Sequence, residues 1–176
     1  MNTPLESRKP ARNGLLDEIE NIILHGYGKK EERRALDKSL RDKYYVELTT
    51  LRHQWEKIYL EVIRTGQVAI GSQCKGILLT LDRVSSSINR TEYGYAPLFD
   101  RVQKIQNDTL NNLLRYDINI ATSLTKLNAD IKSVEGFLKA ASWDKVEALV
   151  GIVNEDIKDL EIAWRNRKKV FDENLE

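Results

Sequence analysis

The sequence of 176 residues contains a single cysteine, Cys74, together with only three prolines and nine glycines. One cysteine excludes both an intrachain disulfide framework and a thiol-rich metal site. Because proline and glycine form most turns, their scarcity predicts few turns and long elements of secondary structure. A β-sandwich needs many more turns than this composition supplies, so the sequence favours an all-α fold.

Long apolar runs and an excess of charge of one sign are also missing. The longest aliphatic run, Ile77 to Leu79, is far shorter than the roughly 18 residues that a membrane span requires. The 28 basic and 27 acidic residues give a formal charge of +1, which provides no general attraction to nucleic acid. Since the N-terminal residues lack the apolar stretch of a secretory signal, we expect a cytoplasmic protein.

The residue types that usually carry catalysis or bind metals are sparse and scattered. His25 and His53 stand far apart, and neither belongs to a Glu-x-x-His pair of the kind found in di-iron sites. Cys74 lies on an apolar stripe, which is typical of a buried structural thiol. The glycine spacing of residues 66–71 is followed by Ser72 where a phosphate-binding loop requires lysine. We therefore expect no enzymatic activity, no cofactor and no metal.

Apolar residues instead recur at alternating spacings of three and four, as on one face of an amphipathic or coiled-coil helix. This pattern predicts an all-α fold, an elongated antiparallel bundle of about four long amphipathic helices with a short N-terminal helix. The four long helices are expected from about Glu31, from Ile70 to Ile88, from Pro97 to about Ala140, and from the N-cap Ser142 onwards. The apolar stripe of the third of these includes Leu113, Tyr116, Ile120, Leu124, Leu127, Ile131 and Val134.

The chain is expected to divide into a flexible tail, a short amphipathic helix with a glycine turn, and the bundle. These cover residues 1–13, 14–28 and 29–176. Breaks within the bundle are expected near residues 66–76, 91–97 and 140–142. At the first break, the glycines leave two alternatives open, a chain that turns back or one long helix with a hinge.

The short N-terminal helix is the most informative candidate for a binding element. It has Leu15, Leu16, Ile19, Ile22 and Ile23 on one side and Asp17, Glu18 and Glu20 on the other. Such a short helix is marginal in water alone, and an anionic bilayer would repel its acidic face. We therefore predict that it docks onto a protein surface. The predicted partner-binding residues are Leu15, Ile19, Ile22 and Ile23, together with Trp143 at the start of the last helix.

These features predict a non-catalytic helical scaffold or assembly subunit that acts through helix–helix contacts with a protein partner. The two apolar stripes of residues 110–121 favour a homo-oligomer, and no nucleic-acid partner is expected. One alternative is a peripheral protein that binds or remodels membrane surfaces through the N-terminal helix, since the outline loosely resembles membrane-remodelling helical-hairpin proteins. A third is an all-helical metal-dependent hydrolase whose carboxylates are Glu155, Asp156, Asp159 and Glu161.

Overall fold

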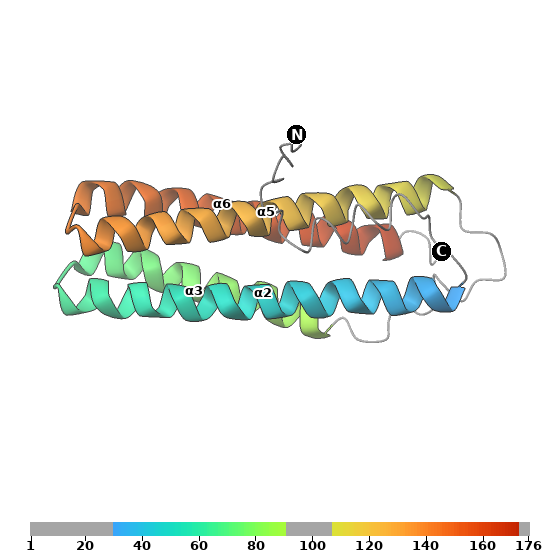
Figure 1. The fold of residues 1–176 in the computed structure, drawn as a ribbon, viewed down its shortest axis with the longest axis horizontal. Helices are drawn as coiled ribbons and strands as arrows, with labels where there is room; N and C mark the ends of the chain where they lie inside the picture. Colours follow the sequence, from blue (N-terminus) through green and yellow to red (C-terminus); the bar gives the residue numbers. More distant parts are fainter. Residues whose placement is uncertain (1–29, 91–106, 173–176) are drawn as a thin grey trace, which may run out of the picture.

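The computed structural model describes residues 30–90 and 107–172, and within these residues it is a bundle of four α-helices (Figure 1). The helices are α2 (Lys30–Arg64), α3 (Val68–Arg90), α5 (Asn107–Lys139) and α6 (Trp143–Asp172). The predicted all-α, elongated bundle is confirmed. The predicted tail, the N-terminal helix of residues 14–28, and the beginning of the third long helix before residue 107 lie outside the described residues.

The four helices form two hairpins that pack side by side. Within each hairpin the helices are antiparallel, whereas α3 packs on α6, and α2 on α5, with both members of each pair running in the same direction (Figure 1). Two side-chain contacts between α3 and α6 show that these helices run in the same direction. Arg83 of α3 binds Glu161 of α6 at 2.8 Å, and one turn further along both helices Trp164 donates a hydrogen bond to Ser87. The order around the bundle is therefore α2, α3, α6, α5, with α3 and α5 on one diagonal.

The apolar stripes of all four helices meet in a continuous core. Trp55 and Cys74 have no exposed surface, and the indole Nε1 of Trp55 donates a hydrogen bond of 2.9 Å to the Cys74 carbonyl. One predicted core position is wrong, because Tyr116 is only half-buried and Asp117 takes its place with no exposed surface. Both residues fit the spacing of three and four after Leu113, so periodicity alone does not distinguish them.

The chain turns back between α2 and α3 at Gly66. This glycine has a φ angle of +76°, its N–H bonds to the Ile63 carbonyl at 3.0 Å, and the next N–H bonds to the Val62 carbonyl at 3.4 Å. These two bonds form a Schellman motif, in which a left-handed residue ends the helix. Gly71 lies within α3, where an added Cβ would be 2.6 Å from Cδ1 of Ile63. It therefore lets α3 approach α2 closely.

The second turn, between α5 and α6, uses the same motif without a glycine. Ala141 has a φ angle of 52° and donates to the Leu138 carbonyl at 3.0 Å, while Ser142 N–H donates to the Phe137 carbonyl at 3.0 Å. The Ser142 carbonyl then accepts the N–H of Val146 at 3.0 Å, which places Ser142 at the N-cap of α6, as predicted. Since alanine rarely adopts this conformation, the turn carries backbone strain.

The variant Ala141→Gly is expected to raise the free energy of unfolding by about 0.5–1 kcal/mol. Removing the Cβ relieves a left-handed strain of roughly 1–2 kcal/mol, and the greater freedom of glycine in the unfolded chain offsets part of that gain. Urea denaturation followed by circular dichroism measures the difference. The matched control is Ala140→Gly, one residue earlier, which should lower stability; a gain in the control and none at 141 would contradict the strain assignment.

Candidate functional site

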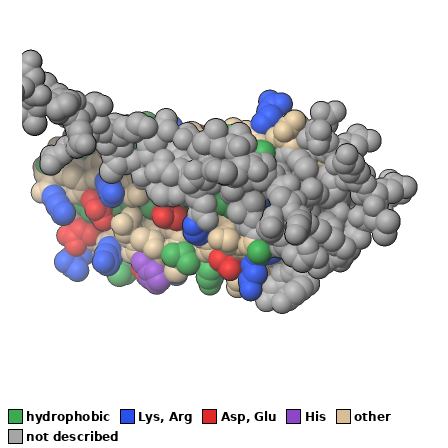
Figure 2. Space-filling view, turned by 45° about the vertical axis from the view of Figure 1, so that its right-hand side comes forward, with side chains coloured by type: hydrophobic (Ala, Val, Ile, Leu, Met, Phe, Trp, Pro, Cys, Tyr) green, Lys and Arg blue, Asp and Glu red, His purple; other side chains and the backbone are tan. Residues whose placement is uncertain are grey.

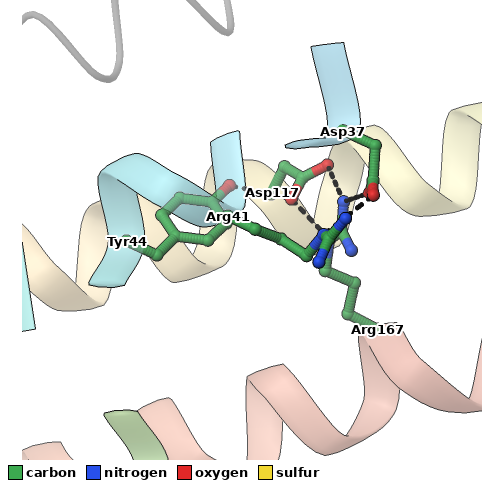
Figure 3. Close-up of polar contacts among 5 residues, drawn as sticks. All are labelled: Asp37, Arg41, Tyr44, Asp117 and Arg167. Atoms are coloured by element: carbon green, nitrogen blue, oxygen red, sulfur yellow. Dashed lines mark hydrogen bonds and ion pairs between the residues drawn. The ribbon is translucent and has the colours of Figure 1, made fainter. Parts of the chain in front are cut away.

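Three charged side chains lie inside the core at the end of the bundle opposite the two turns. Asp37 of α2, Asp117 of α5 and Arg167 of α6 are only 5%, 0% and 2% exposed. Nε of Arg167 donates to Oδ1 of Asp117 at 2.6 Å, and its Nη2 donates to Oδ1 of Asp37 at 2.7 Å (Figure 3). A single guanidinium thus joins three helices through residues that are 50 and 130 positions away from it in the sequence.

Two further side chains complete this buried ion network. The phenol of Tyr44 donates to Oδ1 of Asp117 at 2.8 Å, and Nε of Arg41 donates to Oδ2 of Asp37 at 2.9 Å (Figure 3). The network therefore pairs two arginines with two aspartates, and its formal charge is balanced. Such balance, with hydrogen bonds to the charged groups, is what allows charges to remain in a core.

Burial and the neighbouring charges together set the protonation states of the network. Burial raises the pKa of Tyr44 well above its ordinary value, and the charge of Asp117 raises it further. Burial also raises the pKa of Asp117, against the opposing effect of Arg167. For Arg167, burial alone would lower the pKa, but Asp117 and Asp37 more than offset this and raise it well above the ordinary range. Arg167 thus stays a cation and Tyr44 a neutral donor, which suits structural locking rather than proton transfer.

The network lies at the level where α3 ends. Arg52 of α2 binds Asp82 of α3 at 3.0 Å, and because these helices are antiparallel, Arg90 at the end of α3 lies opposite Tyr44. From Tyr44 to Lys30, α2 continues for about 21 Å. Among the described helices, only α2, α5 and α6 reach this section (Figure 1). Arg167 here contacts Asp37 on the helix diagonal to its own.

Three of the four acidic residues that suggested a hydrolase form ion pairs, each with a different cation. Their ion-pair partners are Lys158 for Glu155, Lys126 for Asp156 and Arg83 for Glu161. Lys126 also binds Asp130 at 3.1 Å, and burial together with this neighbouring carboxylate raises the pKa of Asp156. Within residues 30–90 and 107–172, no group of three or more acidic, histidine or cysteine side chains is placed to hold a metal ion.

The remaining residues singled out from the sequence lie in separate places. Burial raises the pKa of Cys74 to about 12, so the thiol remains protonated, as expected of a structural cysteine. His53 is exposed and lines a groove between α2 and α3 beside the ion pair of Arg52 and Asp82. Trp143 is half-buried and packs against the core. The predicted partner-binding residues Leu15, Ile19, Ile22 and Ile23 lie outside the described residues.

Exposed apolar side chains lie on both sides of the turn between α2 and α3, and Leu79 lies about three turns further along α3, on the same face as Val68. Val68, Leu79, Leu60 and Ile63 are 77%, 61%, 56% and 46% exposed. Both hairpin turns lie at the same end of the bundle, so Trp143 is at this end too (Figure 1). Figure 2 shows small groups of apolar side chains interspersed with charged ones on one face of the described residues. We call Leu60, Ile63, Val68, Leu79 and Trp143 the turn-end surface.

Sequence reasoning missed the three central residues of the ion network, although a signal for each exists. Asp37 lies three residues before Leu40, Asp117 four after Leu113, and Arg167 three after Trp164. Each charge therefore occupies the next position of an apolar stripe. In the sequence alone, Arg167 fits equally well among the basic residues near the C-terminus of a helix, where cations are common. A charge in stripe register is the sequence feature that marks a buried ion pair here.

No helix in the described parts of the chain is long and apolar enough to cross a membrane. Comparisons with protein-family models, with curated proteins and with solved structures found no match.

Proposed function

We propose that this protein is a non-catalytic helical scaffold or assembly subunit of the cytoplasm, which self-associates through helix–helix contacts. The observation that carries this proposal is the turn-end surface. Four large apolar side chains between residues 60 and 79 are 46–77% exposed. Apolar side chains that gather in this way on a water-facing surface commonly mark a protein interface.

The charges beside this surface favour a second copy of the chain over a highly charged partner. Arg64 pairs with Glu61 at 3.0 Å within the last turns of α2, so these two charges offset one another. An apolar centre with a charge-balanced rim is the usual composition of a protein–protein interface. A nucleic-acid partner would instead call for a basic stripe, which this end of the bundle does not present among its described residues.

The second apolar stripe of α5 contributes less to this interface than the sequence suggested. Leu114 and Ile118 are partly buried and pack against the core. We therefore place the self-association contact at the turn end, where Trp143 supplies the aromatic side chain that interface centres often contain. The N-terminal residues Leu15, Ile19, Ile22 and Ile23 remain predicted protein contacts.

The double variant Leu60→Ser/Val68→Ser is expected to weaken self-association more than tenfold. Each substitution removes apolar burial that contributes on the order of 1–2 kcal/mol to the stability of the interface. Sedimentation equilibrium at tens of micromolar measures the change, with thermal unfolding confirming that the monomer fold is kept. Val46→Ser is the matched control, because Val46 is 62% exposed on the same helix but distant from the turn. A wild-type protein that sediments only as a 20.3 kDa monomer would overturn the proposal.

A further inference from the structure

Two acidic side chains at the interface between α5 and α6 bind the same lysine. Nζ of Lys126 on α5 lies 3.1 Å from Oδ2 of Asp130, one turn along the same helix, and it also binds Oδ1 of Asp156, which reaches it from α6. Asp156 is only 8% exposed. With both carboxyl groups ionised, the three side chains would carry a net charge of −1 in a partly buried place, which is unfavourable.

The second oxygen of Asp156 indicates where a proton is held. Its Oδ2 is buried, and none of the described residues donates a hydrogen bond to it. A buried carboxylate oxygen without a donor is costly, whereas a protonated carboxyl group is itself a donor and needs only an acceptor. Asp130 supplies that acceptor, because its side chain and that of Asp156 interact as a hydrogen-bonded pair.

We propose that Asp156 and Asp130 share one proton and form, with Lys126, a pH-sensitive clasp that holds α6 against α5 in mildly acidic solution and weakens when the proton leaves. This inference goes beyond the proposed self-association. In the closed clasp, the proton lies on Oδ2 of Asp156 and is donated to the ionised carboxyl group of Asp130, while Lys126 neutralises the remaining negative charge. On opening, the proton passes to solvent, and two carboxylates remain beside one ammonium group.

The two acids respond to these surroundings in opposite directions. Burial raises the pKa of Asp156, and the hydrogen bond with Asp130 raises it further, against the opposing effect of Lys126. Burial also acts to raise the pKa of Asp130, but its hydrogen bonds with Asp156 and Lys126 outweigh this effect and lower it. A pair of carboxyl groups whose pKa values are driven apart in this way consists of one proton donor and one ionised acceptor.

The signs of these shifts define the pH window of the clasp. An acid whose pKa is raised on folding stabilises the fold fully below its unfolded pKa, and this stabilisation is lost as the pH rises through the folded pKa. An acid whose pKa is lowered stabilises the fold above its unfolded pKa, and this contribution is lost as the pH falls through the folded pKa. The clasp is therefore strongest between the lowered pKa of Asp130 and the raised pKa of Asp156.

The charged groups that face Asp156 come from α5 and belong to the clasp. On its own helix, the adjacent Glu155 is bound to Lys158 at 2.8 Å and points to solvent, with its side chain 68% exposed. On the side of α6 toward α3, Glu161 is bound to Arg83 at 2.8 Å. The pH dependence of the interface between α5 and α6 is therefore assigned to the clasp.

Asparagine at position 156 tests the shared proton. The variant Asp156→Asn imitates the protonated acid, because its carbonyl oxygen can accept from Lys126 while its N–H donates to Asp130. Its folding equilibrium constant should be about threefold or more above that of the wild type at pH 7.5, and within about a factor of two of it at pH 5. An ordinary ion pair between Lys126 and Asp156 predicts the opposite, a loss of stability at pH 7.5. Urea denaturation of the full chain measures both values.

Glu155→Gln is the matched control, because it removes the neighbouring acid of α6 outside the clasp. Its folding equilibrium constant, relative to wild type, should be the same at pH 5 and pH 7.5 to within about a factor of two. A loss of stability in Asp156→Asn at pH 7.5 would overturn the proposal.

Carbon-13 NMR of the side-chain carboxyl groups provides a second readout, which the wild-type protein alone can give. Asp156 should titrate above the ordinary value of 3.8 and Asp130 below it. In Asp130→Asn, the titration of Asp156 should move down, because the side-chain N–H of asparagine can donate to the ionised carboxyl group. A wild-type Asp156 that titrates at or below 3.8, or one whose titration is unchanged in Asp130→Asn, would show that no proton is shared.

Discussion

Replacing Arg167 with methionine is expected to lower the free energy of unfolding by about 3–5 kcal/mol. The substitution keeps most of the side-chain volume but removes the cation that binds Asp117 and Asp37 at 2.6 and 2.7 Å. Two carboxylates would then remain in the core with Arg41 as the nearest described cation of the network. Urea denaturation at pH 7 measures the loss, and a deficit under 1 kcal/mol would show that the network contributes little.

The pH dependence of this variant separates charge from packing. Without Arg167, the influence that lowers the pKa of Asp117 is lost, so burial holds its folded-state pKa even further above the unfolded value. A raised folded-state pKa destabilises the fold at pH values above it, and the penalty shrinks as the carboxyl becomes protonated. The deficit relative to wild type should therefore be larger at pH 7 than near pH 4. The control Arg165→Met, whose side chain is 63% exposed, should stay within about 1 kcal/mol at both pH values.

The second large effect is expected at Trp55, the largest fully buried side chain of the described core. Trp55→Ala should cost about 3–5 kcal/mol, because it opens a cavity where α2 packs on α3. It also removes the hydrogen bond of 2.9 Å from the indole to the Cys74 carbonyl. Thermal and urea unfolding both report this loss.

A more conservative variant divides the Trp55 effect into its parts. Trp55→Phe retains most of the apolar volume but loses the indole N–H, so its deficit should fall to about half or less of that for alanine. His53→Ala, on an exposed position two residues away, serves as the control and should stay within about 0.5 kcal/mol of wild type. Equal deficits at positions 53 and 55 would contradict the core assignment.

The repeating apolar spacings were sufficient to predict the fold. Stripe residues such as Leu48, Ile77, Leu127 and Val153 are all buried as the spacing of three and four requires. The behaviour of the glycine-rich stretch was not predictable, since a helix tolerates glycine at a modest cost. In the structure only Gly66 adopts a positive φ angle, whereas Gly71 and Gly76 continue α3.

The ion network was harder to predict because its parts are distant in sequence. Asp37 and Arg167 are 130 residues apart, and their contact depends on which helices lie diagonally across the bundle. Periodicity gives the face of each helix but neither the order of helices around the bundle nor their relative height. Local rules also misled, since they favoured Tyr116 over Asp117 as the core residue.

The balanced charges of the network also bear on how the helices could slide past one another. Aliphatic layers resemble each other, so a shift of α6 by seven residues, about 10 Å, would still bring apolar side chains together. It would, however, put Leu160 in place of Arg167 opposite Asp117 and Tyr44 and leave a buried carboxylate without its cation. Arg167 thus distinguishes the native alignment of α6 from the alignment shifted by seven residues, which the repetitive apolar side chains alone would not do.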